Sequence, residues 1–115
     1  MPDTAAPRTS LILLACNQAS TVRAAALSCL AQQGEPLEVV LSDDASTDDT
    51  YVVLREVADG YRGPHLVRAR RNPVNLGIGA HYNVLMEETC GELLVTAAGD
   101  DISLPQRCES VTRAW

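Results

Sequence analysis

The chain has 115 residues, 46% of them hydrophobic, which suits one domain with a single core. Phe is absent and only 3% of the residues are aromatic, so Leu, Val, Ile and Ala must form most of that core. The formal net charge of −6 argues against a nucleic-acid partner, because binding a phosphate backbone requires a basic face.

The cysteines and the N-terminal segment bear on the cellular compartment. The 4 cysteines are too far apart for a C-x-x-C pair, so we expect reduced thiols rather than a zinc or redox motif. The apolar run at residues 11–16 is too short to cross a membrane, and Asp3 precedes Arg8 where a signal peptide would be basic. We therefore predict a cytoplasmic protein, or a part of a longer protein at the cytoplasmic face of a membrane.

In chain order, a flexible leader is expected over residues 1–8, and strands and helices then alternate. Apolar runs predict strands at residues 10–16, 37–42, 65–70 and 92–98, the third with the alternation of an edge strand. Helical spacing and stop signals predict helices from about residue 22 to Gly34, over 47–58, from 78 or 79 to 89, and from Pro105 onward.

Local signals refine the helix starts. Ser20 or Thr21 is the expected N-cap of the first helix. Ser46 and Asp49 have the spacing of a capping box for the second helix, and Asp48 suits its first turn.

The order βαβαβαβα predicts an α/β fold, with an open, mostly parallel sheet covered by helices on both faces. We expect residues 9–115 to form this unit. In such sheets the functional loops follow the carboxyl ends of the strands. Here that edge carries "CNQ" after the first strand, "DDAS" after the second and "GDD" after the fourth, which predicts an acidic, concave site.

Each acid pair has two interpretations. Side chains in "DDAS" can cap the following helix, with Asp43 orienting the loop, and Asp101 or Ser103 can cap the last helix. However, two acid pairs at equivalent strand ends favour a shared cation site. Close carboxylates repel each other unless a cation offsets their charge, and Mg²⁺ takes one or two carboxylates together with substrate phosphates.

Three other phosphate-binding folds fit less well. A receiver domain needs a lysine after a later strand, and the chain has no lysine. A P-loop enzyme needs G-x-x-x-x-G-K-[ST], which is also missing. "GIGAHY" at residues 77–82 has only the first two glycines of a dinucleotide-binding motif and follows the wrong strand.

Together, the motifs resemble the nucleotide-sugar-binding N-terminal part of family 2 glycosyltransferases of the GT-A fold. The matching segments, in the family's order, are "LACNQ", "SCLAQQ", "EVVLSDDASTDDT", "NPVNLGIGAHYN" and "GELLVTAAGDDISLPQR". Their order and spacing over residues 10–107 make the resemblance specific, although each segment alone is weak.

The resemblance implies a role for each matching residue. Asp44 would accept a hydrogen bond from the nucleobase, with uracil or thymine N3–H as the natural donor. Asp100 would lie near the ribose or the sugar, and Asp101 would bind Mg²⁺ or Mn²⁺ in the family's DXD-type motif, bridging the ion to the diphosphate. The remaining nucleotide-sugar-binding residues would be Ala15, Cys16 and Asn17 around the base, with Asn75 and Gly77 shaping a loop.

Some positions depart from the family pattern. Cys16 replaces the aromatic residue that often stacks on the base, Ala98 replaces the first acid of D-x-D-D, and Tyr82 replaces a frequent arginine. We interpret His65 and His81 as surface or loop histidines. Arg70 and Arg71 are predicted to be an exposed basic pair, with a phosphate contact as the alternative.

The resemblance implies transfer of a sugar from a UDP- or dTDP-type donor to an acceptor hydroxyl on a saccharide or glycoconjugate, with inversion and metal assistance. The family's general base comes from a later segment, so we expect no catalytic residue in this chain, and a truncated, donor-binding part without the acceptor half. One alternative is a degenerate, non-catalytic module used in assembly or as a homodimer. The other is an unrelated Mg²⁺-dependent α/β enzyme.

Overall fold

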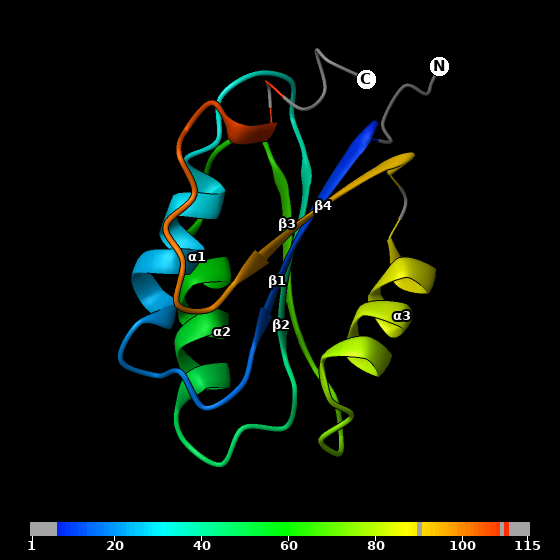
Figure 1. The fold of residues 1–115 in the computed structure, drawn as a ribbon. Helices are drawn as coiled ribbons and strands as arrows, with labels where there is room; N and C mark the ends of the chain where they lie inside the picture. Colours follow the sequence, from blue (N-terminus) through cyan, green and yellow to red (C-terminus); the bar gives the residue numbers. More distant parts are fainter. Residues whose placement is uncertain (1–6, 90, 109, 111–115) are drawn as a thin grey trace.

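A computed structural model describes residues 7–89, 91–108 and 110 and shows an open, parallel sheet (Figure 1). Its 4 strands have the order β3-β2-β1-β4, as the α/β prediction requires. The strands are β1 (Thr9–Ala15), β2 (Glu38–Asp43), β3 (Leu66–Arg71) and β4 (Leu93–Ala98). Each begins within about one residue of its predicted start, and β3 lies at an edge of the sheet as its alternating sequence predicts.

Helices cover both faces of the sheet, which confirms the predicted fold class. Helices α1 (Val22–Leu30) and α2 (Thr50–Gly60) pack on one face, and α3 (Ile78–Glu88) packs on the other (Figure 1). The larger core lies under α1 and α2, and a smaller one around Ile12, Val40 and Leu85 lies under α3. Of the predicted last helix, Arg107, Cys108 and Ser110 are helical, and most of the remainder lies outside the described residues.

The strand register places the candidate loops at one edge of the sheet. Ala15 is paired with Asp43 and Leu14 with Ala98, so β1, β2 and β4 end at nearly the same level. The loops that follow β2 and β4, which carry the candidate acids, therefore lie on either side of the loop that follows β1.

The predicted capping box of the second helix is wrong. α2 begins at Thr50, and neither Ser46 nor Asp49 caps it through a side chain. The Ser46 hydroxyl donates instead to the Asp43 carboxylate, which is fully buried and orients the loop as predicted. Asp48 does act at the helix start, since its Oδ1 accepts the Thr50 N–H over 2.9 Å.

Thr21 is the N-cap residue of α1, but its hydroxyl has another role. It donates to Gly99 O over 2.9 Å and thus ties the start of α1 to the turn after β4. Of the expected leader, residues 1–6 lie outside the described residues. Arg8 O accepts the N–H of Leu93 over 3.1 Å and so joins the residue before β1 to the start of β4.

Cys16, Cys29 and Cys108 are free thiols, and Cys90 lies outside the described residues. Burial raises the pKa of Cys29 to about 12, with the neighbouring Cys108 adding to the shift, so this thiol is inert at neutral pH. Across the described ranges, every helix lacks the length or the apolar character needed to cross a membrane.

Candidate nucleotide-sugar site

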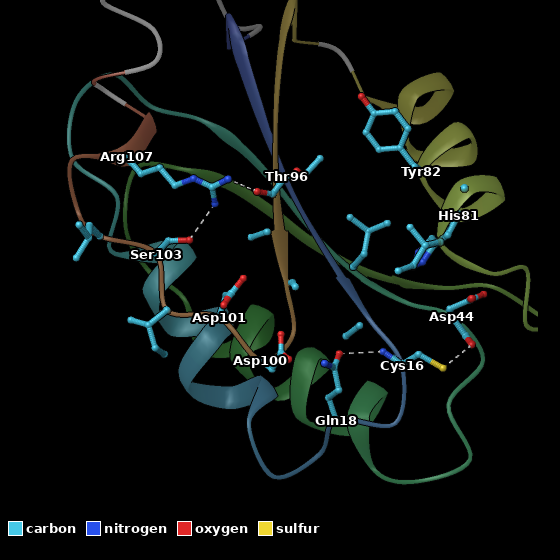
Figure 2. Close-up of a pocket in the computed structure, with 18 of the residues that line it drawn as sticks. Cys16, Gln18, Asp44, His81, Tyr82, Thr96, Asp100, Asp101, Ser103 and Arg107 are labelled. Atoms are coloured by element: carbon cyan, nitrogen blue, oxygen red, sulfur yellow. Dashed lines mark hydrogen bonds between the residues drawn. The ribbon is translucent and has the colours of Figure 1, made fainter.

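A cleft of about 1300 Å³ lies along the carboxyl edge of the sheet. Asp44 lines one end, Asp100 and Asp101 line another part, and Cys16 and Gln18 lie between them (Figure 2). The structure therefore brings the two predicted acid groups to the same cleft, on loops that are far apart in the sequence.

Asp44 is held by hydrogen bonds from the loop that precedes α3. Its Oδ1 accepts the Leu76 N–H over 2.8 Å and Asn72 Nδ2–H over 2.9 Å, and its Oδ2 accepts the Gly77 N–H over 2.9 Å. Burial alone would raise the pKa of Asp44, but these donors outweigh it and hold the pKa below its ordinary value. Asp44 is thus an anionic acceptor at the N-terminus of α3.

The predicted loop-shaping residues, Asn75 and Gly77, support Asp44 from outside the cleft. Asn75 Nδ2–H donates to the carbonyl oxygen of Asp44 over 3.1 Å and approaches Cys16 Sγ at 3.4 Å. Gly77 has φ 83°, in the left-handed region that favours glycine, which turns its N–H toward Asp44. Neither residue lines the cleft itself.

Of the three residues predicted around the base, Ala15 and Cys16 line the cleft and Asn17 does not. Asn17 is exposed, with φ 53°, and its Oδ1 accepts the Thr47 N–H over 2.8 Å. Its own N–H donates to Ser46 Oγ over 2.7 Å. Asn17 therefore joins the first loop to the loop after β2.

Gln18 lines the cleft but was not predicted as a site residue. Its Oε1 accepts the Cys16 N–H over 3.2 Å and also packs on Gly99. A Cβ atom at Gly99 would clash with Gln18 Oε1 and lie 2.9 Å from Ala15 Cβ. The glycine after β4 thus allows a close approach of the first loop, a contact for which the sequence carries no local signal.

Asp100 and Asp101 extend from the turn after β4 and are exposed. The turn is closed by the Asp101 N–H, which donates to Ala98 O over 3.1 Å. Nearby, the Arg107 guanidinium donates to Thr96 O and, over 3.3 Å, to Ser103 Oγ, and it thereby fixes the following segment on β4 (Figure 2).

These two carboxylates have the chemistry to ligate a hard divalent ion. Among the described residues, no group of three or more His, Cys, Asp or Glu side chains could hold a metal ion. The hard oxygens of Asp100 and Asp101 match Mg²⁺ or Mn²⁺, and such ions commonly take only one or two carboxylates together with substrate phosphates.

The prediction that both histidines are surface or loop residues is wrong for His81, which lies in α3, whereas His65 does lie in the loop before β3 but is buried. His81 is 2% exposed, and its Nε2 lies 2.6 Å from Ser42 Oγ. His65 is 7% exposed; its Nδ1 accepts the Leu37 N–H over 3.0 Å. Both partners come from distant parts of the chain, so the burial has no signature around the histidines themselves.

The predicted exposed basic pair is also wrong for Arg70. Its side chain is only 15% exposed, and its Nε lies 3.0 Å from Glu88 Oε1. Arg71 is 47% exposed and pairs with the buried Asp43, with 3.5 Å between Nε and Oδ2. Both arginines therefore have carboxylate partners within the protein.

Solved structures share this fold. The chain matches TarS of Staphylococcus aureus in complex with UDP-GlcNAc at a TM-score of 0.77 and 23% identity, over 92% of this chain and 30% of that one. It matches the mannosyltransferase PcManGT of Pyrobaculum calidifontis, in complex with GDP-Man and Mn²⁺, at a TM-score of 0.83 and 22% identity, over 96% of this chain and 32% of that one. The fold is the Rossmann-like α/β fold of GT-A glycosyltransferases.

Sequence comparison defines the family within that fold. The model of glycosyl transferase family 2 matches residues 10–115, and the chain belongs to this family. It is 36% identical over 93 residues to the Mycobacterium tuberculosis protein Rv1520, covering 80% of this chain and 26% of that one. EpsE of Bacillus subtilis, named as a glycosyltransferase, is 30% identical over 103 residues, covering 90% and 36%. The chain therefore spans about a quarter to a third of these relatives.

Proposed function

We propose that this chain is the donor-binding part of a glycosyltransferase that takes a sugar from a UDP- or dTDP-type donor. The observation that carries the proposal is the shared cleft, with the anionic acceptor Asp44 at one place and the exposed pair Asp100 and Asp101 at another. The nucleotide-sugar complexes of TarS and PcManGT, which have the same fold, support a ligand of this class.

Asp44 is the proposed base-recognition residue. A carboxylate has about four acceptor positions, and protein donors occupy two on Oδ1 and one on Oδ2. The remaining position suits the N3–H of uracil or thymine. Cytosine and adenine present an acceptor at the corresponding ring nitrogen and would be repelled by the anion. Ala15 and Cys16 line the wall beside it.

Asp101 is the proposed metal ligand, with Asp100 toward the ribose or the sugar. A bound Mg²⁺ or Mn²⁺ would supply positive charge that stabilises the departing nucleoside diphosphate. The two side chains contribute hard oxygen ligands at a solvent-accessible turn, which leaves room for phosphate oxygens in the same coordination sphere.

The complete reaction requires groups beyond those in this cleft. We propose that an acceptor hydroxyl on a saccharide or glycoconjugate is deprotonated by a base from another part of a longer protein. The reaction would then proceed with inversion, in the cytoplasm or at the cytoplasmic face of a membrane, in polysaccharide synthesis. This chain would bind the donor and transfer no sugar alone.

Isothermal titration calorimetry with UDP tests donor binding. We expect saturable binding that weakens without Mn²⁺, and loss of binding in Asp44→Ala, whereas the exposed control Asp59→Asn binds as the wild type does. ADP should not bind, because adenine lacks the ring N–H group. The affinities for dTDP and GDP show whether Asp44 also accepts a hydrogen bond from thymine or guanine. No binding of UDP or dTDP by the folded wild-type chain would contradict the proposal.

A second candidate function is a non-catalytic assembly module. It is favoured by Ile102 and Leu104, which line the cleft with 63% and 71% of their surface exposed. Cys16 and Ala98 also favour it, since they depart from the aromatic and acidic residues that the family resemblance implies. This function predicts a stable homodimer in light scattering and no nucleotide affinity. A monomer that binds UDP would exclude it.

A further inference from the structure

A buried chain of polar side chains lies behind Asp44 and begins at Arg70. Arg70 Nη2–H donates to Asn72 Oδ1 over 2.7 Å, and Asn72 Nδ2–H donates to Asp44 Oδ1 over 2.9 Å. Asn72 is 1% exposed, and its backbone N–H donates to Asp43 O over 2.9 Å. Asn72 is thus fixed at both ends of its side-chain amide and at its backbone.

The chemistry of the two neighbours determines the orientation of the Asn72 amide. A guanidinium has only donors and a carboxylate has only acceptors, so the amide oxygen must face Arg70 and the NH₂ group must face Asp44. The reversed amide would place its NH₂ group against the Arg70 guanidinium and its oxygen against the Asp44 carboxylate, and both contacts would be repulsive.

A second branch leads from Arg70 to His81. Arg70 Nη1–H donates to Ser42 Oγ over 2.6 Å, and Ser42 Oγ lies 2.6 Å from His81 Nε2. Burial lowers the pKa of His81, which favours the neutral imidazole at this end of the branch.

Arg70 is itself anchored. Its Nε pairs with Glu88 at the end of α3, and its Nη1 donates to Ser42 on β2. The guanidinium of this β3 residue is therefore fixed by contacts with both α3 and β2. Since this cation does not lose its proton, it sets the direction of every hydrogen bond as far as Asp44.

We propose that Arg70 and Asn72 are positioning residues that determine which acceptor position Asp44 offers to a base, and thereby select bases that present an N–H group. The selection of bases rests on the proposed function. The positioning of Asp44 by Arg70 and Asn72, here called the clamp, does not. With the clamp in place, Oδ1 is fully used and only Oδ2 has a free position at the cleft. Without it, Oδ1 regains an acceptor position, and only the Leu76 and Gly77 N–H groups still fix the carboxylate.

NMR titration of the Asp44 side-chain carboxyl tests the clamp without any ligand. In Asn72→Leu, which has a similar volume and no polar atoms, the pKa of Asp44 should rise toward its ordinary value because a donor to the anion is lost. The matched control is Asn83→Leu, at an exposed position of α3, and it should leave this pKa unchanged. An unchanged Asp44 pKa in a folded Asn72→Leu protein would overturn the clamp.

Calorimetry with UDP and CDP tests the selection. General damage to the fold weakens both ligands alike, whereas loss of positioning lowers the preference for UDP over CDP, by about tenfold for one hydrogen bond to a charged group. An unchanged preference would overturn the selection. A raised Asp44 pKa together with no UDP binding by the wild type would support the clamp and contradict the proposed function.

Two measurements keep the clamp testable if Asn72→Leu does not fold. Arg70→Lys keeps the charge but cannot reach Ser42 and Asn72 together, and it should also raise the Asp44 pKa. In the wild type, the Asn72 side-chain NH₂ protons should exchange slowly with solvent. Rapid exchange would contradict a buried side-chain amide that is hydrogen-bonded to both Arg70 and Asp44.

Discussion

Replacing Asp44 with Asn should destabilise the fold, because protein donors contact both oxygens of the Asp44 carboxylate. The Leu76 and Gly77 N–H groups and the Asn72 amide all donate to its two oxygens. In Asp44→Asn, one oxygen becomes an NH₂ group that faces a donor, and the remaining bonds lose the charge of the acceptor.

The cost follows from these contacts. Hydrogen bonds to charged groups contribute about 1.5–3 kcal/mol each, so loss of one bond and weakening of the others costs about 2–4 kcal/mol. For a domain of this size, a Tm shift of about 3–5 °C per kcal/mol predicts a fall of about 6–20 °C. Urea unfolding at pH 7 measures the free energy directly.

The pH dependence supplies the refuting test. The folded pKa of Asp44 is lowered, so its stabilisation is present above the unfolded pKa, near 4, and is lost as pH falls through the folded pKa. The difference between wild type and Asp44→Asn should therefore shrink below about pH 4. The control Asp59→Asn, with a side chain 74% exposed, should change little. A difference below about 0.5 kcal/mol at pH 7 would refute the reasoning.

Other predictions concern the remaining parts of the site and core. Gly99→Ala should cost about 1–3 kcal/mol in urea unfolding through crowding of the first loop, whereas Gly60→Ala, with open space at its Cβ, should be neutral; equal effects would contradict the packing. Burial lowers the pKa of His81, so between pH 7 and pH 5 the unfolded chain binds a proton at this residue more readily than the folded protein does. The free energy of unfolding should therefore fall from pH 7 toward pH 5. His81→Gln should remove that component, and an unchanged slope would contradict it. Iodoacetamide at pH 8 should modify the partly exposed Cys16 before the buried Cys29, as judged by peptide mass spectrometry; modification of Cys29 in the native protein would contradict its raised pKa.

The strands and the sheet class could be predicted because their signals are local. β1 contains the continuous apolar run LILLA and β2 the shorter run VVL, which indicate strands buried on both faces, and the alternation with helices implies parallel crossovers. The position of Asp44, Asp100 and Asp101 at one cleft followed from the rule that parallel strands carry their functional loops at the carboxyl edge.

The contacts within the site could not be predicted, because they join residues far apart in the chain. The capping box at Ser46 failed since its hydroxyl bonds to Asp43, a competitor that spacing alone does not reveal. The burial of His81 depends on Ser42, 39 residues away, and the role of Gln18 depends on the missing side chain of Gly99.

The most direct test of the central claim is an amide NMR map of the chain with UDP and Mn²⁺. The proposal predicts that UDP shifts the amides of Leu76 and Gly77, which donate to Asp44, and that Mn²⁺ broadens signals around Asp100 and Asp101. Broadening centred on Asp48 and Asp49 instead, or UDP shifts remote from the cleft, would contradict a single site shared by base and metal.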